Sequence, residues 1–289
     1  MRGEDSRRVA ADDLLESEPD GDLHVVIADI NGYTMISSVD PNRLRSGQMP
    51  FVPSITTTAS EGRLYVVDGA SLYVVRGAVL RVPVGRAGAS AICLGTLDGA
   101  ACFALPADEP PVGTEAVPLR QLFGALPDED FAIAGRALGL LAWDRDHRFC
   151  GRCGTPTEPS RTERLRSCTS CGHHSYPRLS PAVIALVERD GRALLARNAQ
   201  RNLPFHSVLA GFVEVGETLE EAVAREIREE AGIEIKDLRY FGSQPWPFTD
   251  SLMIGFTARW ASGELKPDEA EIVDPGWFAA DRLPAVPPK

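Results

Sequence analysis

The chain has 289 residues, of which 44% are hydrophobic and 25% are charged. These values are typical of a globular protein, and the length predicts two or three domains. The formal net charge of −11 argues against a dedicated, sequence-independent nucleic-acid binder. No apolar run approaches the ~18–20 residues that cross a bilayer. The acidic N-terminus lacks the apolar segment of a signal peptide. We therefore expect a cytoplasmic protein with no membrane contact.

Residues 1–146 are predicted to form a strand-rich N-terminal domain of mixed character, with residues 1–20 disordered. Between residues 22 and 105, short runs rich in Val, Leu and Tyr alternate with Gly and Pro, which is the pattern of short strands. A helix is predicted over residues 128–146, with Asp128 as its N-terminal cap. This domain contains no motif that predicts chemistry.

Residues 147–178 contain two Cys-x2-Cys pairs and are predicted to form a separate zinc ribbon. Two pairs at this spacing are typical of two turns that present four thiolates tetrahedrally to Zn²⁺. Four protein ligands leave no position for water, so we expect one structural zinc per chain. A redox-active pair is the alternative, and the second pair argues against it. The predicted ligands are Cys150, Cys153, Cys168 and Cys171.

Residues 179–289 are predicted to form the third domain. Apolar and β-branched runs predict strands at 181–188, 193–198, 208–213, 233–242 and 252–260, with a helix after the third. Alternation of strands and helices in this order favours a mixed sheet flanked by helices, hence an α+β or α/β domain.

The predicted helix of this domain begins and ends at clear signals. Thr218 followed by Glu221 forms a capping box, which predicts that the helix begins near Thr218. Apolar residues then recur at helical spacing. Gly232 is a typical helix terminator.

Three glutamates of this helix point to a cation. Glu226, Glu229 and Glu230 occupy positions i, i+3 and i+4, so their side chains project from one side. Carboxylates that lie so near to one another repel unless a cation neutralises their charge. Their hard oxygen atoms suit Mg²⁺ or Mn²⁺. A solvated acidic helix face is the alternative interpretation.

The segment from Gly211 to Ile233 matches the pattern Gx5Ex7REUxEExGU, with U aliphatic, at every fixed position. It resembles the catalytic box of Nudix hydrolases, which cleave a diphosphate linked to another moiety. The resemblance implies the Nudix α/β/α sandwich for this domain. We expect Arg225 to orient the box glutamates by ion pairing rather than to touch substrate.

A second motif lies beyond the box, where residues 243–251 read SQPWPFTDS. This is similar to the SQPWPFPxS segment of the NADH pyrophosphatase family, with Thr249 in place of a proline. Two prolines around Trp246 predict a stiff turn that holds aromatic side chains against a planar ligand. By resemblance, the substrate-binding residues of this segment are Ser243, Gln244, Trp246, Phe248 and Ser251.

The ribbon, the box and the SQPWPF segment together resemble the NADH pyrophosphatases over about residues 147–280. The resemblance implies hydrolysis of NAD(H) to NMN(H) and AMP, removal of the NAD cap from RNA 5′ ends, and a homodimer. It implies catalytic roles for Glu226, Glu229 and Glu230, which with Glu271 would hold Mg²⁺ or Mn²⁺. Phe212 and Tyr176 match aromatics that enclose a base. The resembling enzymes continue into a further helix after LPAVPPK, so we expect that C-terminal helix to be absent here.

The expected mechanism is in-line attack on a diphosphate phosphorus by a water that the metal activates. One alternative with the same chemistry is an ADP-ribose or dinucleoside polyphosphate hydrolase. Another is an RNA-binding module built on the ribbon, where residues 147–178 contain six Arg and two Glu. That basic excess is modest for binding driven by phosphates.

Overall fold

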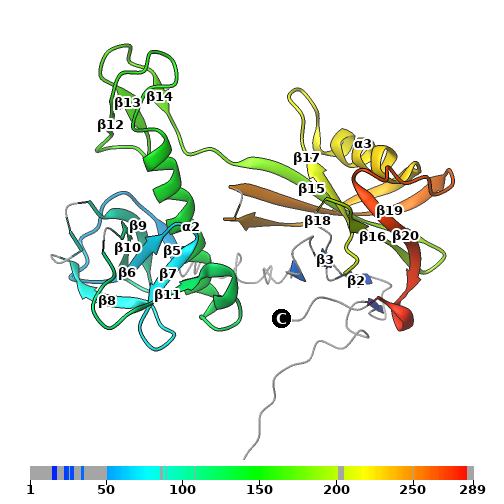
Figure 1. The fold of residues 1–289 in the computed structure, drawn as a ribbon, viewed down its shortest axis with the longest axis horizontal. Helices are drawn as coiled ribbons and strands as arrows, with labels where there is room; N and C mark the ends of the chain where they lie inside the picture. Colours follow the sequence, from blue (N-terminus) through cyan, green and yellow to red (C-terminus); the bar gives the residue numbers. More distant parts are fainter. Residues whose placement is uncertain are drawn as a thin grey trace, which may run out of the picture. The chain divides into compact units, whose positions relative to one another are not determined.

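The computed structural model describes residues 51–284 except 85, 86, 89, 108, 201–204 and 249, together with four short strands before residue 36. The chain divides into two compact units (Figure 1). The N-terminal unit contains Val39–Leu179 and Trp246–Asp250, and the C-terminal unit contains Met1–Ser38, Ser180–Pro245 and Ser251–Lys289.

The first strands are short and pair locally. β1 (Leu15–Ser17) pairs with β2 (Leu23–Val25), and β3 (Ile27–Ala28) pairs with β4 (Thr34–Met35), both antiparallel. Most of segment 1–20, which is predicted to be disordered, lies outside the described residues; Leu15–Ser17 within it form β1. The predicted lack of a C-terminal helix concerns residues beyond the described part of the chain.

The N-terminal unit is built on a seven-stranded sheet, which confirms the strand-rich prediction. Its order is β11-β7-β6-β10-β9-β5, and β8 pairs with β6. The sheet contains β5 (Phe51–Pro53), β6 (Glu61–Asp68), β7 (Ser71–Val74), β8 (Leu80–Pro83), β9 (Ile92–Leu97), β10 (Ala100–Pro106) and β11 (Glu115–Pro118).

Helix α2 (Asp128–Asp146) packs against β6, β9 and β10 and has the predicted bounds; a 3-10 helix, η3 (Leu119–Leu122), precedes it. The predicted cap is wrong, because Asp128 is the first helical residue and Pro127 occupies the cap position without a side-chain hydrogen bond. The fixed φ of proline leads the chain directly into the helix. Three acidic residues in the first turn then interact favourably with the helix dipole and stabilise α2.

A buried acid joins α2 to the sheet of the N-terminal unit. Asp130 is 7% exposed and accepts hydrogen bonds from the Tyr65 hydroxyl at 2.7 Å and from Arg63 Nη1 at 2.8 Å. Burial, followed by the hydrogen bond to Asp130, raises the pKa of Tyr65. Since the Tyr65 side chain is fully buried, this network satisfies polar groups that have no access to water.

The ribbon is a three-stranded antiparallel sheet of β12 (Thr157–Pro159), β13 (Arg166–Cys168) and β14 (His174–Ser175). Two arginines attach it to the rest of the N-terminal unit. Arg164 Nη2 donates to the carbonyl oxygens of Ser54 at 2.7 Å and Cys93 at 2.9 Å. Arg166 forms an ion pair with Asp144 on α2.

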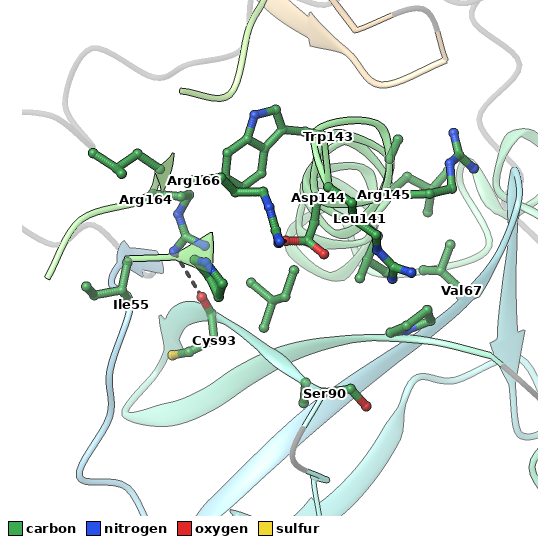
Figure 2. Close-up of a pocket in the computed structure, with 18 of the residues that line it drawn as sticks. Ile55, Val67, Ser90, Cys93, Leu141, Trp143, Asp144, Arg145, Arg164 and Arg166 are labelled. Atoms are coloured by element: carbon green, nitrogen blue, oxygen red, sulfur yellow. Dashed lines mark hydrogen bonds and ion pairs between the residues drawn. The ribbon is translucent and has the colours of Figure 1, made fainter. Parts of the chain in front are cut away.

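A cavity of about 580 Å³ lies among α2, β9 and the ribbon (Figure 2). Apolar side chains such as Leu141 and Trp143 line it together with Arg164 and Arg166. None of the residues predicted to bind metal or substrate is among its lining residues.

The C-terminal unit contains the predicted mixed sheet, with order β18-β19-β15-β16-β20 and β17 paired to β15. β15 and β19 are parallel, whereas the pairs of β15 with β16 and β17 are antiparallel. Its elements are β15 (Ser180–Arg189), β16 (Arg192–Asn198), β17 (Leu209–Phe212), α3 (Leu219–Ala231), β18 (Glu234–Trp246), β19 (Ser251–Ser262), β20 (Ile272–Ala279) and the 3-10 helix η4 (Ala280–Arg282).

Two features of this sheet differ from the sequence prediction. β20 was not predicted, because Pro275 and Gly276 interrupt its apolar pattern. The predicted stiff turn around Trp246 is instead the extended end of β18, and the turn begins at Pro247. Pro245 is tolerated there because β18 is an edge strand in the order of this sheet.

The two sheets share one pairing pattern. In each, the first strand (β6 or β15) pairs antiparallel with the second (β7 or β16) and third (β8 or β17), and parallel with the fifth (β10 or β19). The fourth strand pairs with the fifth, and the sixth pairs with the second. Only the C-terminal unit has an α-helix between its third and fourth strands among the described residues. The N-terminal unit is therefore a related sheet without the acidic helix. No described helix is long and apolar enough to cross a membrane.

The Asp130 network predicts unequal effects of two substitutions on the stability of the N-terminal unit. Asp130→Ala leaves the buried Tyr65 hydroxyl without its acceptor and the partly buried Arg63 with only Asp98, 3.9 Å away, so it should cost about 3 kcal/mol. Tyr65→Phe removes one hydrogen bond and should cost about 1 kcal/mol. Chemical denaturation followed by circular dichroism measures both; equal effects would contradict a shared role for Asp130.

Candidate functional site

Helix α3 begins and ends where the sequence predicts. The Thr218 hydroxyl accepts a hydrogen bond from the backbone N–H of Glu221, and the Glu221 carboxylate accepts one from the backbone N–H of Thr218. Gly232 ends the helix with φ of 73°, a conformation that favours glycine. One face of α3, including Val223 and Ile227, packs into the core of the C-terminal unit. The capped helix thus gives its acidic residues fixed positions.

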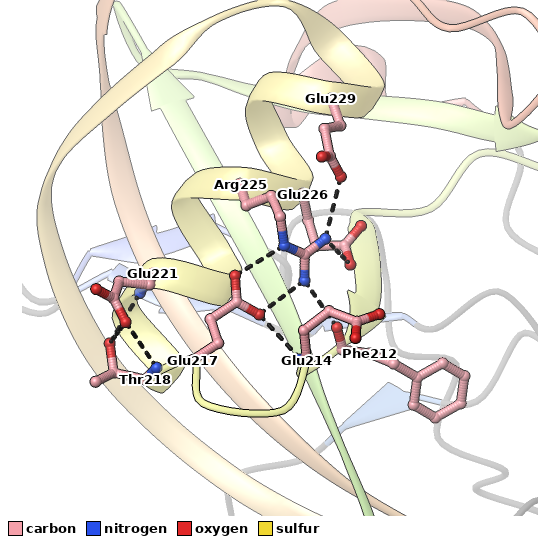
Figure 3. Close-up of polar contacts among 8 residues, drawn as sticks. All are labelled: Phe212, Glu214, Glu217, Thr218, Glu221, Arg225, Glu226 and Glu229. Carbon is pink, nitrogen blue, oxygen red and sulfur yellow. Dashed lines mark hydrogen bonds and ion pairs between the residues drawn. The ribbon is translucent and has the colours of Figure 1, made fainter.

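Arg225 connects the glutamates of α3 to the preceding loop (Figure 3). Its Nε and Nη2 donate to Glu217 at 2.8 and 2.9 Å. Its Nη1 donates to Glu226 at 2.8 Å and to Glu229 at 3.1 Å. Nη2 also donates to the carbonyl oxygen of Phe212 at 2.9 Å. The planar fork of one guanidinium therefore fixes three carboxylates and the end of β17, and the predicted orienting role of Arg225 fits these contacts.

Glu217 belongs to this network although its side chain was not among the predicted site residues. Hydrogen bonds from Arg225, with one from the backbone N–H of Glu214, lower the pKa of Glu217 to about 2. The same pairing with Glu217 raises the pKa of Arg225. The pair is therefore charged at neutral pH. The fixed glutamate at this position of the box was the signal that could have identified it.

Gly211 leaves space for the carboxylate of Glu226. A Cβ atom at Gly211 would lie 2.0 Å from Cδ of Glu226. No side chain larger than hydrogen fits there while Glu226 keeps its position. The first glycine of the box is thus required by a close approach between β17 and the acidic face of α3.

Five carboxylates gather at the C-terminal half of α3. Burial, and after it the charges of the other four carboxylates, raise the pKa of Glu230 to about 8. No described lysine or arginine pairs with its carboxylate. Burial also raises the pKa of Glu226, despite its ion pair with Arg225. The four other acids are Glu226, Glu229, Asp268 and Glu271.

Backbone hydrogen bonds hold Glu271 near α3. The N–H of Asp268 donates to the carbonyl oxygen of Glu230 at 2.9 Å, and that of Lys266 to Ala231 at 2.9 Å. The carbonyl oxygen of Asp268 then accepts from the N–H of Glu271 at 2.9 Å. Hydrogen bonds to the last carbonyl groups of α3 thus position the segment that contains Glu271, the fourth predicted metal ligand. Sequence reasoning missed Asp268, which no spacing rule links to the box.

The carboxylate oxygens of this group are donors of the kind that hard divalent cations prefer, although among the described residues only the four ribbon cysteines have ligand atoms that all lie within 4.8 Å of one another. Several carboxylates, two of them with pKa values raised by burial, lie in one region. Arg225 forms ion pairs with Glu226 and Glu229, and Arg228, which pairs with Glu234, also interacts electrostatically with Glu229. A bound cation would offset their mutual repulsion.

The predicted aromatic residues fall in different units. Phe212 ends β17 in the C-terminal unit and is 55% exposed, so its ring is free to stack on a ligand. Tyr176 belongs to the N-terminal unit, is 52% exposed and donates its hydroxyl to Glu163 at 3.4 Å.

The SQPWPF segment is also divided between the units. Ser243 and Gln244 lie in β18, and Ser251 begins β19 and is 2% exposed. Trp246 and Phe248 belong to the N-terminal unit, where Trp246 is buried and Phe248 packs against the core.

The four ribbon thiolates form a site that fits zinc. Their Sγ atoms all lie within 4.8 Å of one another. Three Sγ–Sγ separations are 3.7, 3.5 and 3.5 Å, close to the spacing of about 3.8 Å expected for tetrahedral Zn–S bonds of ~2.3 Å. The backbone N–H groups of Arg152 and Cys171 point to the Sγ atoms of Cys150 and Cys168 at 3.4 Å. The closed ligand set supports a structural zinc.

Gly211→Ala should weaken divalent cation binding by about 10–100-fold, because the new methyl group displaces the Glu226 carboxylate. Backbone strain is not expected, since Gly211 lies in a strand and has no positive φ. Isothermal titration with Mn²⁺ measures the change. Gly151→Ala is the control, because a Cβ there meets no atom within 4 Å. Unchanged Mn²⁺ affinity in Gly211→Ala would show that Glu226 is not a ligand.

Cys153→Ser should lose most of its zinc and unfold the ribbon, which has little core besides the metal site. Metal analysis gives the zinc content, and limited proteolysis between residues 147 and 178 reports the unfolding. Cys93→Ser is the matched control, because the Cys93 thiol lies outside the four-thiolate cluster. Full zinc occupancy in Cys153→Ser would contradict the four-thiolate site.

Three domain families match consecutive parts of the chain. Residues 53–143 match the NADH pyrophosphatase-like rudimentary NUDIX domain, residues 145–176 the NADH pyrophosphatase zinc ribbon domain, and residues 177–289 the NUDIX domain. The first match agrees with a sheet that repeats the C-terminal pairing pattern without the acidic helix.

Two relatives that match most of the chain give the same result. The chain is 43% identical over 235 residues to the NAD-capped RNA hydrolase NudC of Deinococcus radiodurans, a match that covers 79% of this chain and 80% of that protein. It is 45% identical over 196 residues to the protein of the same name from Pseudomonas aeruginosa, covering 67% of this chain and 70% of that protein. The chain therefore belongs to the NudC family of NUDIX hydrolases.

Proposed function

We propose that the protein hydrolyses the diphosphate bond of NAD(H) to NMN(H) and AMP and also removes the NAD cap from RNA 5′ ends. The single observation that carries this proposal is the convergence of Glu226, Glu229, Glu230 and Glu271 at the end of α3, inside a chain that belongs to the NudC family. Such a cluster has a clear use in binding a cation that contacts phosphate oxygens.

In this proposal, Glu226, Glu229 and Glu230 are the catalytic residues and bind Mg²⁺ or Mn²⁺ together with Glu271. These residues would hold a cation whose Lewis acidity would favour ionisation of water and offset charge on the phosphate oxygens. Arg225 keeps Glu226 and Glu229 oriented through its two Nη1 contacts.

The substrate side of the proposal uses two exposed aromatic rings and the SQPWPF segment. Phe212 and Tyr176 have rings exposed enough to stack on a base. The remaining proposed substrate-binding residues are Ser243, Gln244, Trp246, Phe248 and Ser251. A homodimer and a cytoplasmic location complete the proposal and rest on resemblance and composition.

In this proposal, the protein binds RNA as part of the capped substrate and not through a basic protein surface. Arg164 and Arg166 of the ribbon are engaged in holding it to the N-terminal unit. The four exposed arginines of residues 147–178 are Arg148, Arg152, Arg161 and Arg178. Four exposed cations favour weak, salt-dependent contacts with a transcript that is held mainly by its cap.

Glu230→Gln and Glu229→Gln should each lower kcat for NADH by several orders of magnitude, because each removes a charged oxygen ligand while keeping side-chain volume. Steady-state assays with Mn²⁺ and mass analysis of products measure the loss, and circular dichroism checks the fold. Glu220→Gln is the control, since Glu220 lies on the same helix in the first turn and outside the acidic cluster. Near-normal turnover by both site variants would refute the assignment.

A substrate panel separates this proposal from the hydrolases of related substrates. We expect NADH to have a higher kcat/KM than ADP-ribose and diadenosine polyphosphates. ADP-ribose as the only substrate would instead favour the ADP-ribose hydrolase. RNA binding that persists in Glu230→Gln without any turnover by the unaltered protein would favour a binding module.

A further inference from the structure

A short segment at the end of β18 is structurally part of the N-terminal unit. Residues Trp246–Asp250, here called the Trp246 segment, begin with the last residue of strand β18 but cluster with Val39–Leu179. Trp246 is 5% exposed, and Phe248 packs against the core that includes Leu119, Leu122 and α2. The rudimentary domain therefore provides the surroundings of two residues of the SQPWPF motif.

Arg120 on η3 contacts both aromatic rings of the Trp246 segment. Its guanidinium carbon lies 4.2 Å from the ring centre of Phe248 and 6.0 Å from that of Trp246. The two rings pack edge to face, with centres 5.1 Å apart and planes at 77°. A planar cation over an aromatic face restricts the orientation of that ring. Arg120 thus fixes the rings relative to the N-terminal unit.

Gly135 on α2 allows Pro247 to approach the helix. A Cβ atom at Gly135 would lie 2.8 Å from Cγ and 3.1 Å from Cβ of Pro247. The pyrrolidine ring cannot turn away as a flexible side chain could, so the segment itself would have to move. Glycine inside a helix lowers helix stability relative to alanine. The close approach is the visible reason for glycine at this buried position.

From these contacts we infer that Arg120 and Gly135 of the rudimentary domain are positioning residues for substrate recognition, acting through Trp246, Pro247 and Phe248. This inference rests on the proposed function, in which the SQPWPF segment binds the dinucleotide. The inference gives the N-terminal unit a role although no α-helix lies between its third and fourth strands among the described residues. This unit holds the Trp246 segment, whereas α3 carries the glutamates proposed to bind the cation.

The matched pair Gly135→Ala and Gly139→Ala tests this inference on the full-length protein. Both glycines lie in α2, one turn apart, and both substitutions should favour the helix equally. A Cβ at Gly139 has an ordinary contact of 3.5 Å with Oδ1 of Asp250. Only the change at Gly135 therefore displaces the segment.

We expect Gly135→Ala to raise KM for NADH at least tenfold, with kcat and Mn²⁺ affinity within twofold of the unaltered protein. Gly139→Ala should leave all three values within twofold. Arg120→Ala should raise KM in the same way, and Arg120→Lys should recover part of the loss because it keeps the cation. A merely destabilising change would lower the thermal midpoint without this separation of KM from kcat.

Equal KM values for Gly135→Ala, Gly139→Ala and the unaltered protein would overturn the inference and leave the proposed function intact. If Gly135→Ala does not fold, Arg120→Ala decides in its place, and an unchanged KM again overturns the inference. Failure of the unaltered protein to hydrolyse NADH would overturn the proposed function and this inference with it.

Discussion

The acidic site depends on one guanidinium. Arg225 binds Glu217 with two donors and shares a third between Glu226 and Glu229, while it also holds the end of β17 through the carbonyl of Phe212. Without this cation, the carboxylates on one side of α3 would repel one another and the loop before the helix would lose its anchor. Glu230 is different, because burial rather than pairing controls its charge and raises its pKa to about 8.

The two sheets share one pairing pattern but support different parts of the proposed site. The C-terminal sheet carries a helix between its third and fourth strands, and the acidic residues come from that helix and from the segment tied to its end. The N-terminal sheet has no α-helix there among the described residues, but it packs α2 and η3 against the Trp246 segment. The N-terminal unit can provide this packing surface without such a helix, because α2 and η3 follow the strands of its sheet as separate elements.

Sequence motifs predicted the features that depend on residues close together in the chain. The capping box at Thr218 and the terminator Gly232 gave the limits of α3, and the cysteine spacing predicted a thiolate cluster that closes within 4.8 Å. What depends on distant residues was not predictable. Asp268 reaches the acidic cluster only through hydrogen bonds to the end of α3. Trp246 was expected in a turn, yet it ends a strand and is buried in the other unit.

The central claim is that water attacks a phosphorus of the dinucleotide, and isotope labelling tests it most directly. NADH is hydrolysed by the full-length protein with Mn²⁺ in water enriched in ¹⁸O, and the products are analysed by mass. The account predicts NMNH and AMP, with one ¹⁸O atom in a phosphate group of one of the two nucleotides. Products cleaved at the glycosidic bond, or nucleotides without ¹⁸O in any phosphate, would contradict it.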